Sequence, residues 1–269
     1  MLIYLFWFLF MTLLNLNQAD LSDIRLIASD VDGTLTQNSK FSSNFISTLI
    51  NLQSAGMKVL LVTGRSAGWV SALVNYLPVA GAIAENGGVF LQPNGQQDLL
   101  SLVPNLSRHR ILLENTFHHI KQLFPNLLTS TDNQFRITDW TFDVDNLSTE
   151  DIQAISSQCH QMGWSFTYSN VQCHIKPLHQ DKATGLDTVL KNHFPEINLQ
   201  QVLTVGDSPN DEAMFNLAKF PISVGVANVL HYQDKMLHFP QYVTQTSEFD
   251  GFSELAQLLL KNSVLDDNM

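Results

Sequence analysis

The feature that most constrains the fold of this chain is a short apolar segment that ends in two closely spaced aspartates. The segment from Ile24 to Ala28 is mostly apolar and predicts a short buried strand. Asp30, Asp32 and Gly33 follow it. In an open α/β sheet, ligands bind just beyond the carboxyl ends of the strands, where these two carboxylates would emerge. Gly33 permits a tight turn that leaves space for a substrate.

Two acids in this arrangement favour a magnesium site. Carboxylates two residues apart can converge on one cation, one through its side chain and the other partly through its backbone. Mg²⁺ takes oxygen ligands and is usually bound by one or two carboxylates together with a substrate phosphate. The segment therefore predicts Mg²⁺ and a phosphate group at this edge of an α/β sheet.

The composition narrows the class of protein and its partners. A chain of 269 residues that is 45% hydrophobic and 14% charged is typical of one large α/β domain, or of a core with an inserted second domain. Its net charge of −11 argues against a nucleic-acid partner, because phosphate contacts need a basic face. An anionic substrate would need local help from a metal, Lys, Arg and backbone N–H groups. Cys159 and Cys173 form no C-x-x-C motif, so we expect free buried thiols in a cytoplasmic protein rather than a zinc site or a disulfide.

Residues 1–14 are almost entirely apolar and stand apart from the rest of the chain. They are shorter than the roughly 20 residues that span a membrane, and no Lys or Arg precedes them as in a secretory signal. Three interpretations stay open: a signal-like or anchoring segment, a hydrophobic edge packed on the domain, or an over-extended start. We favour the last, with Met11 as the true first residue, and therefore expect no membrane partner. Residues 1–20 are expected to be separate from the domains that follow.

The next predicted elements alternate between helix and strand. Ser43 is a typical N-cap residue, residues 45–52 carry apolar side chains at helical spacing, and Gly56 is typical of a helix end. Residues 58–62 then predict a second buried strand, and residues 81–84 a third. Strands that alternate with helices are typical of an open α/β sheet.

The second strand ends in residues that suit an anion. Thr63 and Gly64 follow it directly, and a helix is predicted to span Ala67 to Tyr76. A hydroxyl group and free backbone N–H groups at the N-terminus of a helix form a natural seat for an anion. Thr63 and Gly64 are therefore candidate anion-binding residues.

Residues 90–178 have a different organisation and predict a small inserted module. Its expected elements are a helix over 107–124, a half-buried strand over 135–145, a helix over 149–162 with a capping box at Ser148, and a hairpin of 164–168 and 172–176. We therefore expect an α/β core formed by residues 21–89 and 179–269, with residues 90–178 inserted as an α+β domain.

A further group of polar residues follows the next predicted core strand. This strand is expected over 201–205, and Asp207 and Asp211 come after it at a spacing of four. A carboxylate at the end of a buried strand, with a second one four residues later, can complete a Mg²⁺ shell. A helix over 212–218 is expected next. Lys182 begins another predicted helix, after a loop that contains a proline.

Four motifs along the chain together resemble those of the haloacid dehalogenase-like phosphatases. D-V-D-G-T-L-T, which begins at Asp30, resembles the first motif, Thr63 the second, Lys182 the third, and G-D-S-P-N-D at residues 206–211 the fourth. Only 33 positions separate Asp30 from Thr63, whereas 119 separate Thr63 from Lys182, which places an inserted cap in the second interval. This layout is similar to the Cof-type and sucrose-phosphatase-like branch. It implies a Rossmann-like parallel-sheet core with an inserted α+β cap domain.

The resemblance also implies a role for each motif residue. Asp30 would attack phosphorus and form an aspartyl-phosphate, while Asp32 would protonate the leaving group and then take a proton from water. Mg²⁺ would be held by Asp30, the backbone carbonyl of Asp32 and Asp207, with Asp211 behind them. The groups that would bind phosphate oxygens are Thr63, Gly64, Lys182 and Asn210.

Substrate contacts outside the motifs are less constrained. Arg65 and Arg136, the second on the predicted strand 135–145, are candidate substrate-binding residues. The histidines show no metal-ligand spacing, and the Phe and Trp residues of the cap are expected in its core.

The leading hypothesis is a Mg²⁺-dependent phosphatase that acts on a small phosphorylated metabolite, with a sugar phosphate as the favoured class. Two alternatives stay open: a phosphomutase of the phosphomannomutase type, which carries a similar first motif and cap, and a non-catalytic phosphosugar-binding protein. Thr63-Gly64-Arg65 and the compact fourth motif favour the hydrolase, and the complete set of motif carboxylates argues against a binding protein. The sequence indicates neither the particular substrate nor the oligomeric state.

Overall fold

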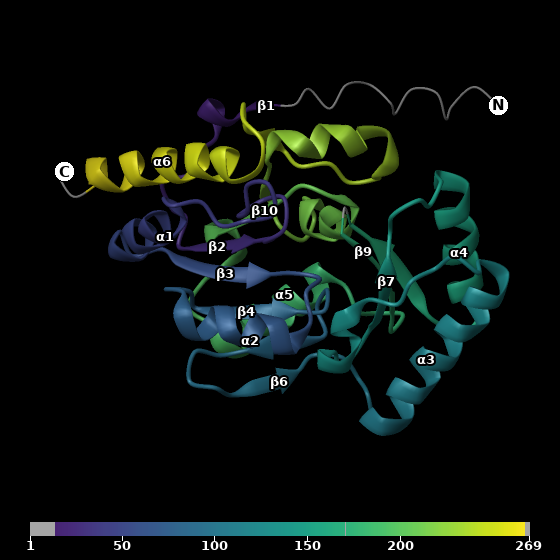
Figure 1. Cartoon of the computed structure of the whole chain (residues 1–269). Helices are drawn as coiled ribbons and strands as arrows, with labels where there is room; N and C mark the ends of the chain where they lie inside the picture. Colours follow the sequence, from purple (N-terminus) through teal and green to yellow (C-terminus); the bar gives the residue numbers. More distant parts are fainter. Residues whose placement is uncertain (1–13, 170, 267–269) are drawn as a thin grey trace.

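The computed structural model describes residues 14–169 and 171–266, which fold into two β-sheets with helices packed against them (Figure 1). In spatial order, the nine strands of the larger sheet in these residues are β1 (Leu14–Asn15), β12 (Tyr242–Val243), β11 (Ile222–Gly225), β10 (Val202–Gly206), β2 (Leu26–Ser29), β3 (Lys58–Val62), β4 (Gly81–Ala84), β5 (Val89–Leu91) and β6 (Gln97–Leu99). Neighbours from β1 to β4 are parallel, whereas β5 and β6 are antiparallel additions at one edge. The predicted α/β class with a parallel core is confirmed.

The two faces of the large sheet bury separate apolar clusters. One face is covered by α1 (Phe45–Ser54), α2 (Ala67–Tyr76) and α6 (Glu248–Asp266), and the other by α5 (Lys182–His193) and the 3₁₀ helix η4 (Pro209–Phe215). Because side chains alternate along a strand, Ile27 of β2 belongs to the first cluster and Leu26 and Ala28 to the second. With both faces covered, the carboxyl edge of the strands is the place left for a ligand.

Most core elements lie where the sequence predicted them. β3, α2 and β4 occupy the predicted residues. The predicted N-cap at Ser43 is wrong, because α1 begins after Asn44, which has helical backbone angles and makes no capping hydrogen bond through its side chain. The helix predicted over 212–218 is instead the tighter η4, which starts earlier because Ser208 and Asp211 form a capping box around it.

A second, smaller unit lies beside the end toward which β3 points (Figure 1). Its antiparallel sheet has the strand order β7 (Trp140–Asp143), β9 (Gln172–Lys176), β8 (Ser165–Tyr168), and its apolar face packs against α3 (Leu106–Leu123) and α4 (Thr149–Gln161). Cys159 and Cys173 are free and buried in this cluster, as predicted. The capping box at Ser148 is present, with Asp151 as its second member.

The predicted start of the inserted domain, at residue 90, falls inside β5. β5 pairs with β4, and β6 pairs with β5, so both strands extend the large sheet. We therefore propose that the inserted cap begins after β6 and ends before α5.

The strand predicted over 135–145 is wrong in its first half. A 3₁₀ helix, η2 (Thr131–Phe135), comes first, and Arg136 lies in the connection to β7 rather than on a strand. The backbone N–H groups of Ile137 and Thr138 donate to the carboxylate of Glu85, which belongs to the core. These N–H groups are therefore taken by the core and are not offered to a neighbouring strand.

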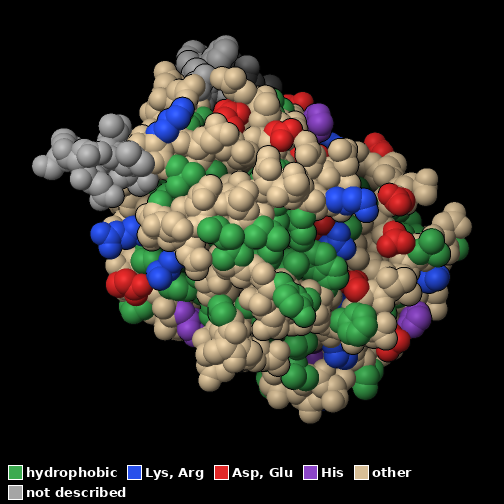
Figure 2. Space-filling view, turned by 60° about the vertical axis from the view of Figure 1, so that its left-hand side comes forward, with side chains coloured by type: hydrophobic (Ala, Val, Ile, Leu, Met, Phe, Trp, Pro, Cys, Tyr) green, Lys and Arg blue, Asp and Glu red, His purple; other side chains and the backbone are tan. Residues whose placement is uncertain are grey.

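The face shown in Figure 2 carries charges of both signs. Lys and Arg side chains lie among Asp and Glu, and hydrophobic side chains gather toward the centre. Across the described part of the chain, no helix combines the length and apolar character needed to cross a bilayer. The question of a start at Met11 lies outside the described residues. Of the predicted segment 1–20, residues 14–15 form the edge strand β1 and Leu16 is buried in the core.

Candidate active site

Three neighbouring parallel strands bring the motif residues to one edge of the large sheet. β10, β2 and β3 pair side by side, so their carboxyl ends are adjacent. Asp30 follows β2, Thr63 follows β3 and Asp207 follows β10. Carboxylate oxygens of Asp30, Asp207 and Asp211 lie within 4.8 Å of one another, and all three residues are buried. The acidic residues of the first and fourth motifs thus form one cluster.

A buried lysine bridges two of these carboxylates. Lys182 is the first residue of α5, and its side chain is fully buried. Its Nζ donates to Asp30 Oδ1 at 2.5 Å and to Asp211 Oδ1 at 2.6 Å. Burial alone would lower the pKa of Lys182, but Asp211 and Asp30 together raise it above its ordinary value. The side chain is therefore a cation that offsets part of the local negative charge.

Hydrogen bonds from the first and fourth motifs, and one from Asn228, hold the two carboxylates that follow β10. Asp211 Oδ2 accepts from the backbone N–H groups of Asp207 at 2.9 Å and Ser208 at 3.1 Å. Asp207 accepts from the hydroxyl of Thr34 at 3.1 Å and from the side-chain amide of Asn228 at 2.8 Å. Thr34 belongs to the first motif, so the first and fourth motifs are joined directly. Neither Thr34 nor Asn228 was among the predicted site residues.

The crowding of carboxylates favours either a bound proton or a cation. The pKa of Asp30 is raised to about 7, chiefly by burial, with Asp211 and Asp32 adding to the rise and Lys182 opposing it. Burial also raises the pKa of Asp207 well above its ordinary value, and Asp30 and Asp211 contribute. A divalent cation among these oxygens would relieve the repulsion. Three buried carboxylates are hard oxygen donors, and they fit Mg²⁺.

Thr63 and Gly64 connect β3 to the start of α2. The hydroxyl oxygen of Thr63, which is buried, accepts from the backbone N–H of Arg65 at 3.1 Å. Gly64 lies under the cap, where a Cβ atom would be only 3.0 Å from the ring of His174. Thr63 and Gly64 line the same pocket as the two aspartates of the first motif. Thr63 and Gly64 of the second motif therefore lie beside Asp30, the proposed nucleophile of the first motif.

Asp32 lies outside the three-carboxylate cluster and forms an ion pair with Arg65. The guanidinium donates to the two carboxylate oxygens from Nε at 2.7 Å and from Nη2 at 2.6 Å. These hydrogen bonds to Asp32 raise the pKa of Arg65, against the opposing effect of its burial. Arg65 also lies over the ring of Trp69, 5.0 Å from its centroid. Arg65, which the sequence suggested as a substrate contact, therefore pairs with Asp32 in this structure. Metal binding by the backbone carbonyl of Asp32 stays a prediction.

Asn210 is held in a short chain of polar side chains. Its Oδ1 accepts from the hydroxyl of Ser208 at 2.7 Å, and its Nδ2 donates to Asn86 Oδ1 at 3.1 Å. Asn86 follows β4 and has a left-handed backbone conformation, with φ of 51°. Asn210 and Asn86 line a pocket of about 280 Å³ together with Lys182. Asn86 was not among the predicted site residues.

Arg136 ties the cap to the core. A guanidinium has five N–H donors, and here they meet acceptors on Asp132, Asp139, Gln172 and the backbone carbonyl of Gly64. The Arg136 side chain is fully buried. These contacts leave no N–H group for a substrate, so we interpret Arg136 as a structural link and not as the substrate contact that the sequence suggested.

Glu85, which was not among the predicted site residues, forms a second link between cap and core. Its buried carboxylate accepts from the backbone N–H groups of Ala67 at 3.0 Å, Ile137 at 3.0 Å and Thr138 at 2.6 Å. Ala67 is the first residue of α2, and the other two lie in the cap. One carboxylate thus joins the helix of the second motif to the cap.

Replacing Glu85 by glutamine is expected to lower the free energy of unfolding by about 1–3 kcal/mol. The side-chain amide would turn N–H donors toward backbone donors and leave buried groups unpaired. Urea denaturation measures the change. Glu114→Gln, at an exposed position on α3, is the matched control and should change stability by less than about 0.5 kcal/mol. Equal effects at the two positions would contradict a linking role for Glu85.

The cap also contributes polar side chains to the pocket through β9. Gln172 and His174 line the pocket that contains Asp30. In β9, Gln172, His174 and Lys176 alternate with two apolar residues of the cap core, and the whole strand is buried. Since side chains alternate along a strand, the three polar residues share one face. A strand with one apolar and one polar face was the sequence signal that could have identified His174.

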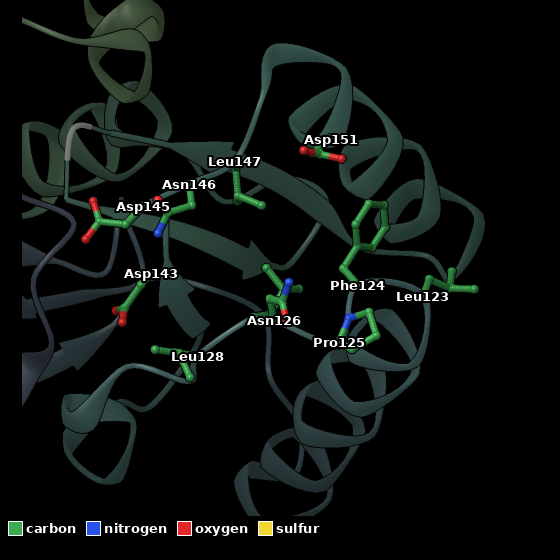
Figure 3. A pocket seen from close by; sticks show the side chains of 11 residues that line it. Leu123, Phe124, Pro125, Asn126, Leu128, Asp143, Asp145, Asn146, Leu147 and Asp151 are labelled. Atoms are coloured by element: carbon green, nitrogen blue, oxygen red, sulfur yellow. The ribbon is translucent and has the colours of Figure 1, made fainter.

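The pocket around Asp30 and Asp32 is small, with a volume of about 10 Å³. A larger pocket of about 540 Å³ lies between the end of α3 and the start of α4 (Figure 3). Phe124, Leu128 and Asp145 are among its lining residues, and none of the residues that line it belongs to the four motifs. We therefore assign the candidate active site to the small pocket, where the chemically reactive groups converge.

The family model of the haloacid dehalogenase-like hydrolases matches residues 27–102 and 103–255 of this chain. These two ranges cover most of the sequence and contain all four motifs. The chain therefore belongs to the haloacid dehalogenase-like hydrolases.

Two named relatives are similar over most of the chain. A phosphoglycolate phosphatase of Thermoplasma acidophilum is 29% identical over 196 residues, which are 72% of this chain and 82% of that protein. A phosphoglycolate phosphatase of Methanothrix thermoacetophila is 28% identical over 236 residues, which are 86% of this chain and 95% of that protein.

Solved structures support the same fold. Thermoplasma acidophilum 0175 has a TM-score of 0.70 at 22% identity, with 88% of this chain and 98% of that chain covered. The sucrose-phosphatase from Synechocystis sp. PCC6803, solved with sucrose and phosphate, has a TM-score of 0.63 at 18% identity, with coverages of 87% and 97%.

Proposed function

We propose that the protein is a Mg²⁺-dependent phosphatase that hydrolyses a small phosphorylated metabolite through an aspartyl-phosphate intermediate. The observation that carries this proposal is the convergence of three buried carboxylates and Lys182 at the carboxyl edge of the sheet. Thr63 and Gly64 line the same pocket as Asp30 and offer a hydroxyl and a backbone N–H group to a phosphate. The names of the two relatives support a small phosphorylated substrate.

Asp30 would act as the nucleophile. Attack of its carboxylate on phosphorus would form an Asp30–phosphate bond and break the bond to the leaving oxygen, to which Asp32 would donate a proton. Water would then attack the aspartyl-phosphate while Asp32 takes its proton, so that Asp30 is restored and inorganic phosphate is released. Each of the two displacements is easier than direct attack of water on the ester.

Arg65 controls when Asp32 can donate a proton. Both carboxylate oxygens of Asp32 accept hydrogen bonds from the Arg65 guanidinium, and this pair holds Asp32 away from a leaving oxygen. We therefore expect Arg65 to leave Asp32 when substrate binds, so that Asp32 can act first as an acid and then as a base.

Mg²⁺ bound in this site would neutralise charge between the anionic nucleophile and the anionic phosphate. Asp30, Asp207 and Asp211 present the carboxylate oxygens that would hold it. Lys182, the Thr63 hydroxyl, the Gly64 N–H and the Asn210 amide would hold the non-bridging phosphate oxygens as charge moves toward the leaving group.

The test is phosphate release from a panel of phosphorylated sugars, polyols and hydroxy acids, phosphoglycolate included, with Mg²⁺ and with EDTA. We expect inorganic phosphate in the presence of Mg²⁺ and its loss with EDTA. An isomerised phosphoester without release of phosphate would indicate a phosphomutase. Binding without any product would indicate a phosphosugar-binding protein, and either result would overturn the proposal.

Added Mg²⁺ is expected to raise the melting temperature more at about pH 8 than at about pH 5. The pKa of Asp30 is raised from 3.8 to about 7, so in the metal-free protein this group contributes stability that is fully present below pH 3.8 and is lost as the pH rises through 7. At low pH the bound proton competes with the cation, whereas at high pH the cation replaces it. Thermal denaturation with and without Mg²⁺ measures the difference.

Two variants control this measurement. Asp207→Asn removes one of the three clustered carboxylates and should remove most of the Mg²⁺ effect, whereas Asp145→Asn, in the pocket remote from the motifs, should retain it. A Mg²⁺ effect that is the same at both pH values would contradict binding among these carboxylates.

A further inference from the structure

Lys176 is a buried cation without a carboxylate partner. It is the last residue of β9 and is only 4% exposed. Its Nζ donates to the backbone carbonyl of Gln180 and, at 3.3 Å, to the hydroxyl of Ser165. None of the ion pairs that the described residues form includes Lys176. An ammonium group has three N–H donors, and a buried charge is costly unless it is paired. Lys176 therefore retains one donor and lacks a counter-ion.

The nearest carboxylates offset the burial of Lys176 only in part. The pKa of Lys176 is lowered from 10.5 to about 8, because burial outweighs the opposing effect of Asp181 and Asp139. Asp181 has other partners, since its two carboxylate oxygens accept from the backbone N–H of Thr184 at 2.7 Å and from the hydroxyl of Thr184 at 2.9 Å. Asp139 forms an ion pair with Arg136. An anion against the Lys176 ammonium group would supply the charge that these residues do not.

The pocket that Lys176 lines adjoins the candidate active site. It has a volume of about 280 Å³, and Lys182 and Asn210 line it as well. Asn210 also lines the small pocket that contains Asp30. We call the larger of these two the Lys176 pocket. It has room for an anion of the size of phosphate beside a group bound at Asp30.

The charged side chains that line the Lys176 pocket do not neutralise one another. Lys182 is paired with two carboxylates of the motif cluster. The carboxylate of Glu212 accepts from two backbone N–H groups. Lys219 is exposed and, like Lys176, is in none of the ion pairs of the described residues. The pocket thus presents two ammonium groups that have no carboxylate partner.

The Lys176 pocket can be reached from the surface. Phe166, Thr167 and Pro209 line both this pocket and a larger one of about 650 Å³. The larger pocket lies between α4 and the 3₁₀ helix η5 (Ala227–Lys235), and exposed residues of both elements line it. A small anion therefore has a path from solvent to Lys176.

We propose that the Lys176 pocket is a second anion site, in which the Lys176 ammonium group binds a phosphate or carboxylate group. Hydrogen bonds between an ammonium group and an oxyanion are among the stronger polar contacts in proteins, and here the anion would also be the missing counter-ion. The site is separate from the phosphate seat beside Asp30, and it does not depend on the proposed phosphatase activity. The anion has two sources to distinguish: a free ion, or a second anionic group on an ester whose phosphate lies at Asp30.

The test is the binding of inorganic phosphate in EDTA, measured by isothermal titration calorimetry at pH 7 and constant ionic strength. Without a divalent cation the clustered carboxylates around Asp30 repel phosphate, so the titration reports the Lys176 pocket. We expect one phosphate per chain with a Kd of about 1 mM or below. Lys176→Met should raise this Kd by about 10-fold or more. Lys191→Met, which removes an exposed ammonium group, should leave it unchanged.

Two results of this titration would overturn the anion site: no binding by the wild type, or the same Kd in the wild type and in Lys176→Met. If Lys176→Met does not fold, Lys219→Glu decides. This variant places a carboxylate at an exposed position of the same pocket and should raise the Kd by about 3-fold or more. An unchanged Kd in Lys219→Glu would then overturn the site.

A second comparison identifies the source of the anion. Phosphoglycolate and ethyl phosphate are esters that differ in one carboxylate group. If the anion belongs to the ester, Lys176→Met should lower kcat/KM for phosphoglycolate by about 10-fold or more beyond any loss with ethyl phosphate. Equal effects on the two esters would assign the site to a free ion. No turnover of any ester would overturn the proposed phosphatase, whereas the anion site is decided by the titration alone.

Discussion

Asp30→Asn is expected to lower kcat by about 10⁴-fold or more, with little change in fold. The substituted amide has nearly the same shape as the carboxylate but cannot attack phosphorus, so the aspartyl-phosphate does not form. The structure gives a second reason for a large effect, since Asp30 is also one of the three clustered carboxylates and a partner of Lys182. Initial rates of phosphate release with the best substrate of the panel measure kcat.

Two controls separate loss of the nucleophile from loss of structure. Asp145→Asn makes the same chemical change at a position remote from the motifs and should retain wild-type kcat. Asp30→Asn should also keep a cooperative thermal transition. If Asp30→Asn retains a tenth or more of the activity, roughly the effect of one weak contact, another group is the nucleophile.

Lys182→Met is expected to cause the largest loss of stability, about 3–5 kcal/mol near pH 8. Methionine fills a similar volume, but it leaves Asp30 and Asp211 without their shared cation in a fully buried position. At lower pH the loss should shrink, because Asp30, whose pKa is raised to about 7, can then bind a proton in place of the ammonium group. Urea denaturation at two pH values measures both effects, and turnover should be lost as well.

Lys191→Met provides the matched control in the same helix. Lys191 pairs with Asp187 at 2.6 Å, but its side chain is 71% exposed, and such surface pairs contribute only about 0.2–1 kcal/mol. A similar loss at Lys191 and Lys182 would show that helix propensity, and not the buried charge cluster, decides the effect.

The core was predictable because its elements are defined by nearby residues. β3, α2 and β4 are bounded by turn residues and strong apolar runs, and they lie where the sequence placed them. The segment before β7 was not predictable in this way. Ile137 and Thr138 give their backbone N–H groups to Glu85, more than 50 positions earlier in the chain, and a local pattern of alternating side chains holds no information about such a partner.

In the candidate site, too, some residues could be predicted from local sequence, whereas the roles of others depend on distant contacts. Asp30, Thr63, Lys182 and Asp207 follow from strand ends and motif order, and the structure brings them to one edge of the sheet. The role of Arg65 depends on how the segments after β2 and β3 meet, and the roles of Arg136 and His174 depend on how the cap packs on the core. The sequence offered the charge of the two arginines, but not their partners: Asp32 for the first, and the carbonyl of Gly64 with three cap residues for the second.

The short segment after β4 both holds the cap and lines a pocket, which limits how caps can be exchanged between relatives. Glu85 holds the cap at Ile137 and Thr138, and its neighbour Asn86 lines the pocket that also contains Lys182 and Asn210. A cap grafted from a relative would have to present its own backbone donors to Glu85, or the graft would disturb Asn86 as well. Exchange of caps among members of the family should therefore succeed when the segment that contains Glu85 and Asn86 travels with the cap, and fail when the two are separated.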